Sequence, residues 1–166
     1  NTIIVGVCAK KAACNFEFNT TTSTMTISGN GNMNNYTSEI ATPWYSYKND
    51  ILKIKINEGI KSIGNYAFYK CMKLETLDLP TSTAIIGIAS FEKCSNLSSV
   101  AFGEDLLTIS DYAFKDCKKL KNITFKSIRP PKVFTNTWKN TSKNLIVSMP
   151  VASDKDYVAS LGIEQQ

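Results

Sequence analysis

The residue type with the most reactive chemistry in this chain is cysteine, which occurs five times, whereas histidine is absent from all 166 residues. Without an imidazole the chain cannot form a Ser-His-Asp or Cys-His catalytic centre, and it also lacks the commonest metal ligand in proteins. An odd number of cysteines leaves at least one thiol unpaired or bonded to another chain. The composition therefore predicts that the protein is not an enzyme and that it carries no cofactor.

Three of the cysteines, Cys71, Cys94 and Cys117, recur at a constant interval of twenty-three positions. Metal sites usually need close pairs such as Cys-x-x-Cys, so this spacing does not favour a metal centre. On stacked neighbouring coils the side chains would be parallel and ~4.8 Å apart, which opposes the torsion that a disulfide requires. We expect all three thiols to be reduced, buried and used as small apolar side chains.

Cys8 and Cys14 form a separate pair close to the N-terminus. In an extracellular protein they could close a small loop that holds down the first residues of the chain. The spacing leaves both a bridged and an unbridged pair open.

The interval that separates these three cysteines also governs the apolar positions from Ile51 to Phe125. The repeated columns are Ile63, Ile86 and Ile109; Phe68, Phe91 and Phe114; Leu74, Leu97 and Leu120; Leu77, Val100 and Ile123; and Leu79, Phe102 and Phe125. A period of roughly 20 to 29 residues with Leu-x-x-Leu-x-Leu spacing is typical of a leucine-rich repeat solenoid. We expect a β-rich solenoid of about four to five coils, in which each coil buries its apolar face against its neighbours.

Within each repeat, a Leu-x-Leu triplet such as Leu77-Asp78-Leu79 predicts a short strand whose outer two side chains point inward. Equivalent strands of successive coils would then pair in parallel and form a ladder. On the opposite side of the coil, Asn65 and Asp111 are predicted to cap short helical turns that present Ala and Phe to the core.

The two ends of the chain do not carry the period. Asn15–Asn19 and Thr24–Ser28 alternate apolar and polar residues, which predicts a β-hairpin. Near the other end, Leu145–Met149 predicts one more strand, and Ser153 is the expected N-cap of a short helix that runs to Leu161. We therefore predict one folded unit, with an N-terminal β cap over 1–47, leucine-rich repeats over 48–126 and a strand-helix C-terminal cap over 127–166.

The net charge of +5 comes almost entirely from lysine, since Arg129 is the only arginine. Arginine is favoured for bidentate reading of guanine and phosphate, so this surface does not point to nucleic acid as a partner. No apolar run approaches the ~18 residues that would cross a bilayer, so we expect no membrane insertion by this segment. The cluster of Lys118, Lys119 and Lys121, with Lys115 nearby, is an alternative site for an anionic ligand.

The sequence Ser-Ile-Gly-x-Tyr-Ala-Phe-x-x-Cys-x-x-Leu at Ser62–Leu74 recurs with changes in copies that end at Leu97 and Leu120. This motif resembles that of the BspA-like leucine-rich repeat surface proteins, and segments at both ends of the chain also look like that family. The resemblance implies an extracellular or cell-surface protein, secreted and adhesin-like, that engages host or extracellular-matrix components.

If the repeats bind a protein partner, the natural site is the outward face of the strand ladder. Alternation predicts eight outward residues, which are Lys53, Lys55, Thr76, Asp78, Ser99, Ala101, Asn122 and Thr124. The alternative is a non-catalytic carbohydrate-binding or accessory domain of a larger surface protein. Sugar stacking would require Trp44, Tyr45 or Tyr47 to lie exposed in a coplanar patch, so the exposure of Trp44 separates the two hypotheses.

Overall fold

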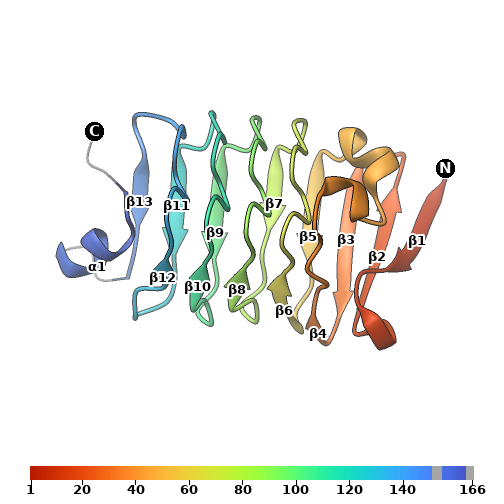
Figure 1. Ribbon diagram of the computed structural model, residues 1–166, viewed down its shortest axis with the longest axis horizontal. Coiled ribbons are helices and arrows are strands. Elements are labelled where there is room, and N and C mark those ends of the chain that lie inside the picture. The colour runs from red at the N-terminus through yellow and green to blue at the C-terminus, as the bar shows by residue number, and fades with distance from the viewer. Residues whose placement is uncertain (151–154, 164–166) are drawn as a thin grey trace.

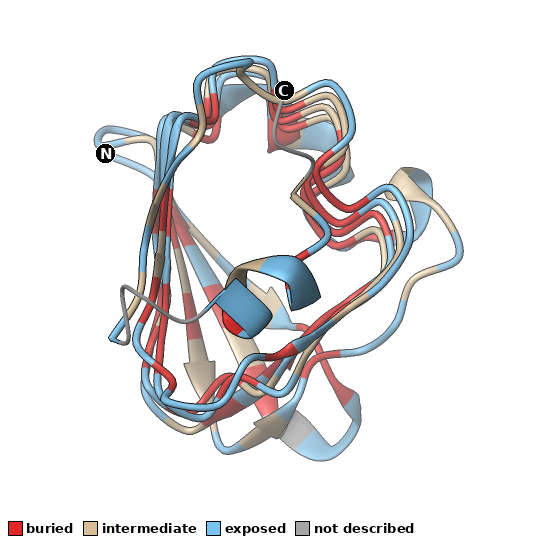
Figure 2. Cartoon of the chain, turned by 90° about the vertical axis from the view of Figure 1, so that its left-hand side faces the viewer, coloured by how far each residue is buried: buried red, intermediate tan, exposed pale blue. Residues whose placement is uncertain are grey.

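The computed structural model describes residues 1–150 and 155–163, which wind into an elongated stack of coils with the N-terminus at one end and residues 155–163 at the other (Figure 1). Seen along the stack, the coils overlay closely and buried residues line their inner side (Figure 2). The strands are β1 (Ile3–Val7), β2 (Cys14–Asn19), β3 (Thr24–Gly29), β4 (Gly31–Asn32), β5 (Lys53–Ile56), β6 (Ile60–Ile63), β7 (Thr76–Asp78), β8 (Ile85–Ile86), β9 (Ser99–Phe102), β10 (Thr108–Ile109), β11 (Asn122–Phe125), β12 (Lys132–Val133) and β13 (Ile146–Ser148). Short 3-10 helices occupy Lys10–Ala12, Glu39–Ala41 and Tyr45–Asp50, and α1 is Lys155–Ser160.

Two ladders of parallel strands run along the stack, which confirms the predicted solenoid. The first ladder consists of two sheets that follow one another along the stack. Strands β3, β5 and β7 pair in parallel in one sheet, and β9, β11 and β13 pair in parallel in the other. The second ladder has the order β12-β10-β8-β6-β4. Residues one repeat apart pair directly, as Ile54 does with Leu77 and Val100 with Ile123, so the sequence period is also the strand register.

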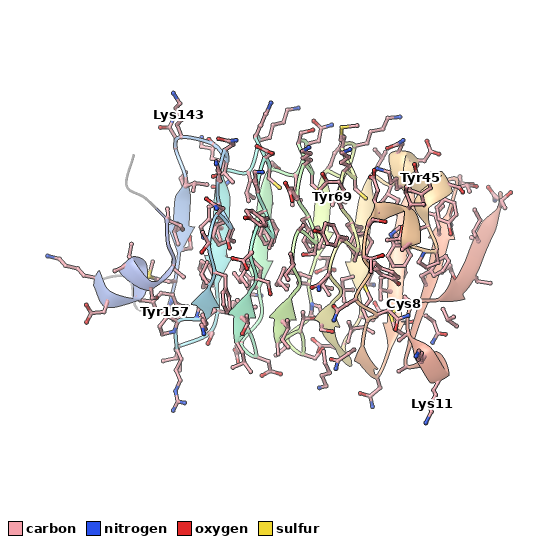
Figure 3. The ribbon with its side chains drawn as sticks, in the orientation of Figure 1. Cys8, Lys11, Tyr45, Tyr69, Lys143 and Tyr157 are labelled. Atoms are coloured by element: carbon pink, nitrogen blue, oxygen red, sulfur yellow. A yellow bond between two sulfur atoms is a disulfide. The ribbon has the colours of Figure 1, made fainter. Side chains whose placement is uncertain are left out.

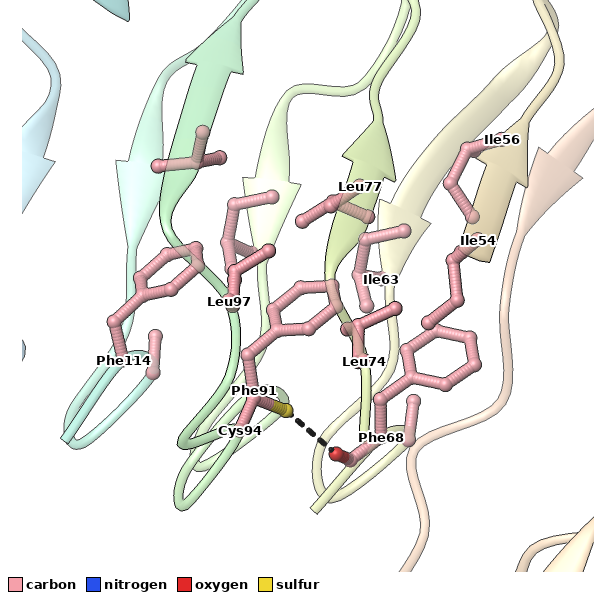
Figure 4. Packing of buried hydrophobic residues seen from close by; sticks show 14 of the residues in the cluster. Ile54, Ile56, Ile63, Phe68, Leu74, Leu77, Phe91, Cys94, Leu97 and Phe114 are labelled. Carbon is pink, nitrogen blue, oxygen red and sulfur yellow. Dashed lines mark hydrogen bonds between the residues drawn. The ribbon is translucent and has the colours of Figure 1, made fainter. Parts of the chain in front are cut away.

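The core is built from the predicted apolar columns, and one of them forms a continuous stack of aromatic rings. Phe68, Phe91 and Phe114 lie with ring centroids 5.5 and 5.3 Å apart and nearly parallel planes (Figure 4). Trp44 stacks on Phe68 at 5.1 Å, and Trp138 stacks on Phe114 at 5.4 Å. This aromatic stack therefore joins the coils, with a buried tryptophan at each end.

Each of these tryptophans also has a partner for its polar atom. Trp44 Nε1 donates to the Ala67 carbonyl at 2.7 Å, and Trp138 Nε1 donates to the Leu161 carbonyl at 2.7 Å. A buried indole N–H without an acceptor would destabilise the fold, so these bonds allow tryptophan to close the stack.

The prediction that Asn65 and Asp111 cap helical turns of their own coils was wrong. Asn65 Oδ1 instead accepts the N–H of Ile88, at 2.9 Å, and Asp111 Oδ1 accepts the N–H of Thr135, at 3.0 Å, so each side chain bonds to the following coil. The residue after each of them, Tyr66 or Tyr112, has a positive φ, which turns the chain and prevents a right-handed helix from starting there. The side chains are thus free to satisfy a backbone donor of the neighbouring coil.

At the N-terminal end, β2 and β3 form the expected antiparallel hairpin, and β3 then joins the parallel ladder through β5. An additional strand, β1, pairs antiparallel with β2. Its sequence, IIVGV, has no polar alternation, which is why the pattern did not predict a strand there.

At the C-terminal end, β12 pairs with β10 directly after Pro131, so the second ladder continues past residue 126. Strand β13 lies within the predicted Leu145–Met149, while Ser153, the expected N-cap of the helix, lies outside the described residues. The division into caps and repeats at 47/48 and 126/127 stays a prediction, because ladder strands lie on both sides of each boundary.

Candidate functional site

The eight residues predicted to face outward come together on one surface, formed by β5, β7, β9 and β11 and called the ladder face below. Seven of them are exposed and Thr124 is half-buried, whereas the residues between them, such as Ile54 and Val100, are buried. Lys53 pairs with Thr76 and Lys55 with Asp78; Ser99 pairs with Asn122 and Ala101 with Thr124. These side chains are therefore arranged in register without a packing role.

The chemistry of the ladder face changes along the stack. Lys53 and Lys55 make its β5 end basic, Asp78 adds a carboxylate, and the β9 and β11 positions are small or polar. The eight residues include no Trp, Tyr or Arg, the side chains that most often anchor protein interfaces.

A shallow hollow of about 410 Å³, which the sequence did not predict, borders the ladder face at the ends of β5 and β7. Lys55, Asp78 and Lys126 contribute to its lining together with Glu58. The Glu58 carboxylate accepts the backbone N–H groups of Thr81 and Ser82, at 2.8 and 3.3 Å, and the bond from Thr81 lowers its pKa. Glu58 therefore serves to join two coils, and Lys55, Asp78 and Lys126 are the charged groups left to face a ligand.

The aromatic patch required by the carbohydrate-binding alternative is not formed by the three residues predicted for it. Trp44 is completely buried in the aromatic stack, and the half-buried Tyr47 ring stacks on Phe18 at 5.1 Å. Tyr45 alone is exposed, at 42%. These positions consequently offer no exposed coplanar platform for a sugar ring.

The cysteines fall into two groups in the structure. Cys8 and Cys14 are joined by a disulfide that closes the loop between β1 and β2. Cys71, Cys94 and Cys117 are free thiols and completely buried.

Two of the repeat thiols have a polar role that the sequence did not reveal. Cys94 Sγ donates to the Phe68 carbonyl at 3.2 Å (Figure 4), and Cys117 Sγ donates to the Phe91 carbonyl at 3.1 Å. Burial raises the pKa of Cys71 to about 12 and raises the pKa of Cys94 and of Cys117 well above the ordinary value. The column therefore consists of protonated thiols that pack in the core, and two of them also bond to the preceding coil.

We predict that alkylating reagents will not modify these three thiols in the folded protein at about pH 8, because the thiolate is the reactive form and its formation is suppressed by burial. Unfolding without a reductant should expose three reactive thiols, and unfolding with a reductant should expose five. Intact-protein mass spectrometry counts the added groups. Labelling of the native protein would contradict the burial of the column, and five reactive thiols before reduction would contradict the disulfide.

Among residues 1–150 and 155–163, no group of three or more His, Cys, Asp or Glu side chains could hold a metal ion. Within the same range, no helix has the length and apolar character needed to cross a membrane.

Comparison with known proteins identifies the repeat and the fold. A family model for the BspA type leucine-rich repeat region matches residues 14–145 in six copies. A comparison with curated protein sequences found no match. Among solved structures, a leucine-rich repeat protein from Eubacterium ventriosum has a TM-score of 0.68 and 18% identity over 91% of this chain and 45% of that chain.

Two further solved structures resemble this chain less closely. A leucine-rich repeat protein from T. pallidum has a TM-score of 0.48 and 15% identity, covering 87% of this chain and 65% of that chain. A leucine-rich cell surface protein from Faecalibacterium prausnitzii has a TM-score of 0.42 and 16% identity, covering 87% and 55%. This chain spans less than half the length of the Eubacterium protein, whose likeness shows the fold. Because the family model covers most of the sequence, the chain belongs to the BspA-type leucine-rich repeat family.

Proposed function

We propose that this protein is an extracellular or cell-surface interaction module, adhesin-like in function, that binds a host or matrix protein through the ladder face. The observation that carries this proposal is the set of eight outward residues held in register on β5, β7, β9 and β11 without packing against the rest of the chain. Because the strands beneath them are fixed by parallel pairing and a buried core, the face presents a preformed surface to a partner.

The Cys8–Cys14 disulfide supports the proposed location, since disulfides persist mainly in oxidising compartments outside the cytosol. The ladder face gives no support to a catalytic role, because its only ionisable groups are Lys53, Lys55 and Asp78. Lys53 and Lys55 favour a partner that presents acidic residues to β5, with smaller side chains packed against β9 and β11.

The proposal is tested by measuring binding of the full chain to a panel of purified extracellular-matrix proteins, with a glycan array in parallel. Ala101→Arg places a large charged side chain near the middle of the ladder face. For any matrix protein that binds, we expect this substitution to weaken affinity by about tenfold or more, because the added side chain blocks close contact.

The matched control is Ile85→Arg, which introduces the same side chain at an exposed position of β8, on the second ladder. The control should leave affinity unchanged. Equal loss of binding in both variants would exclude the ladder face as the site. Binding to uncharged glycans alone would favour a carbohydrate module, and binding to neither proteins nor glycans would indicate a structural spacer.

A further inference from the structure

Positive charge is concentrated in one part of the solenoid. The segment 115–143 contains nine basic residues and one acidic residue, whereas the rest of the chain contains ten basic and thirteen acidic residues. The net charge of the whole chain, +5, therefore hides a segment of +8 beside a remainder of −3. Such an asymmetry creates a local positive field that attracts anionic ligands.

Much of this charge lies on one edge of the stack, in the turns that precede the strands of the first ladder. Lys118, Lys119 and Lys121 occupy the turn before β11. The backbone N–H of Lys121 donates to the Ser98 carbonyl at 3.0 Å, and the N–H of Ile146 donates to the Lys121 carbonyl at 2.7 Å. These bonds align the lysines with equivalent turns on the coils to either side.

The fold does not require lysine at these positions. In the preceding coil the equivalent residues are Ser95, Asn96 and Ser98, and one coil earlier they are Met72, Lys73 and Glu75. All three turns occupy equivalent positions in the ladder. These residues have a net charge of zero in the two earlier turns and of +3 in the turn before β11. The repeat therefore folds without lysine at these positions, and the three lysines before β11 are not explained by packing.

The next coil adds two more lysines to this edge. The Lys139 carbonyl accepts the N–H of Asp116 at 2.8 Å, and the N–H of Ser142 donates to the Leu120 carbonyl at 3.2 Å, which places Lys139 and Lys143 on the coil beside Lys118–Lys121. Figure 3 shows the Lys143 side chain extending from the upper edge of the molecule. We call the five exposed side chains of Lys118, Lys119, Lys121, Lys139 and Lys143 the lysine ridge.

The carboxylates of Glu92 and Asp116 already have other partners. Glu92 forms an ion pair with Lys115 at 3.4 Å, and Asp116 Oδ1 accepts the side-chain amide of Asn140 at 2.7 Å. Lys119 Nζ donates to Asn96 Oδ1 at 2.9 Å, which is a neutral acceptor. Among the described residues, the ion pairs do not include a ridge lysine, so five positive charges face solvent.

We propose that the lysine ridge binds a linear sulfated polysaccharide of the glycosaminoglycan type. Ammonium groups are compact point charges that suit closely spaced anions of varied orientation, whereas planar carboxylate and phosphate recognition favours the arginine fork, which the ridge lacks. Adjacent coils ~4.8 Å apart carry the lysines in rows that a linear polyanion can follow.

Two observations favour a sulfated polysaccharide over nucleic acid as the polyanion. The two segments that carry the ridge lysines, 118–121 and 139–143, contain no aromatic side chain on which bases could stack. The Cys8–Cys14 disulfide is typical of proteins in compartments outside the cytosol, whereas nucleic acid lies mainly inside cells. The lysine ridge adjoins the ladder face where Lys121 precedes Asn122, but none of its five lysines belongs to the ladder face. Substitutions in the ridge therefore test polyanion binding independently of the proposed protein partner.

Heparin is the probe for the test, and the full chain is compared with the triple variant Lys118→Ser, Lys119→Gln, Lys121→Ser. The serines match those of the preceding coil, and glutamine keeps a donor for Asn96, so the variant should fold normally. We expect the native chain to bind heparin with an affinity that falls steeply with salt, and the variant to bind about tenfold or more weakly with a shallower salt dependence, because fewer counterions are released.

The control variant is Lys10→Ser, Lys11→Ser, Lys61→Ser, which also lowers the net charge from +5 to +2 but removes exposed lysines that belong neither to the lysine ridge nor to the ladder face. It should retain most of the heparin affinity of the native chain. Equal weakening of both variants would show a response to net charge and overturn the proposal, as would no binding to heparin. Tighter binding to desulfated heparin, to a DNA duplex or to phosphatidylserine vesicles than to heparin would assign the ridge to another ligand.

Discussion

Replacing Phe91 with alanine should lower the free energy of unfolding by about 3–5 kcal/mol, the range typical of a buried aromatic side chain removed from a packed core. Phe91 is completely buried at the centre of the aromatic stack, between Phe68 and Phe114. The substitution removes ring contacts on both sides and leaves a cavity that neighbouring coils cannot close without breaking their strand pairing. Equilibrium denaturation monitored by circular dichroism measures the change.

Tyr112→Ala is the control for this experiment, because Tyr112 is 39% exposed and lies outside the stack. It should cost less than about 1 kcal/mol, as expected for a surface substitution. If Phe91→Ala and Tyr112→Ala destabilised the chain equally, the stack would not be a principal source of stability.

Replacing Trp44 with alanine should have an effect of similar size, about 3–5 kcal/mol. The substitution removes the ring that stacks on Phe68 and contacts Phe16, and it leaves the buried Ala67 carbonyl without its indole donor. Because each coil of a solenoid is stabilised mainly by its neighbours, loss of an end residue should loosen the nearest coils first. Hydrogen exchange should therefore accelerate more in β3 and β5 than in β11.

Two variants separate the contributions at this position. Trp44→Phe keeps a stacking ring but loses the Nε1 donor, so it should cost about 1–3 kcal/mol, the penalty for an unsatisfied buried polar group. Tyr45→Ala, at an exposed neighbouring position, should leave stability nearly unchanged. Strong destabilisation by Tyr45→Ala, or none by Trp44→Ala, would contradict the role given to Trp44.

The two proposed binding surfaces differ in how the repeat produces them. The ladder face results from the strand alternation itself, since each outward residue lies between buried ones. The lysine ridge results from residues that vary between equivalent turns, where packing imposes no choice. Binding data that respond to one set of substitutions and not the other would show which surface a given ligand uses.

The sequence by itself determined the repeat architecture, because a buried column presents nearly the same environment in every coil. Phe68, Phe91 and Phe114 recur at equal spacing for that reason, and the strand register follows from the same spacing. The outward residues of the ladder face could be predicted with equal accuracy, since alternation along a strand is a local property.

Only the tertiary structure decided which groups meet across coils. The thiols of Cys94 and Cys117 donate to backbone carbonyls more than twenty residues away. The side chains of Asn65 and Asp111 likewise accept backbone N–H groups more than twenty residues away. Every residue has such backbone groups, so the sequence does not indicate which of them will be the partner. At the C-terminal end, the repeat interval counted from Phe114 ends at Thr137, yet the ring that stacks on Phe114 belongs to the next residue, Trp138. A periodic pattern cannot anticipate such a shift, because the ring that fills the end of the stack is selected by three-dimensional packing.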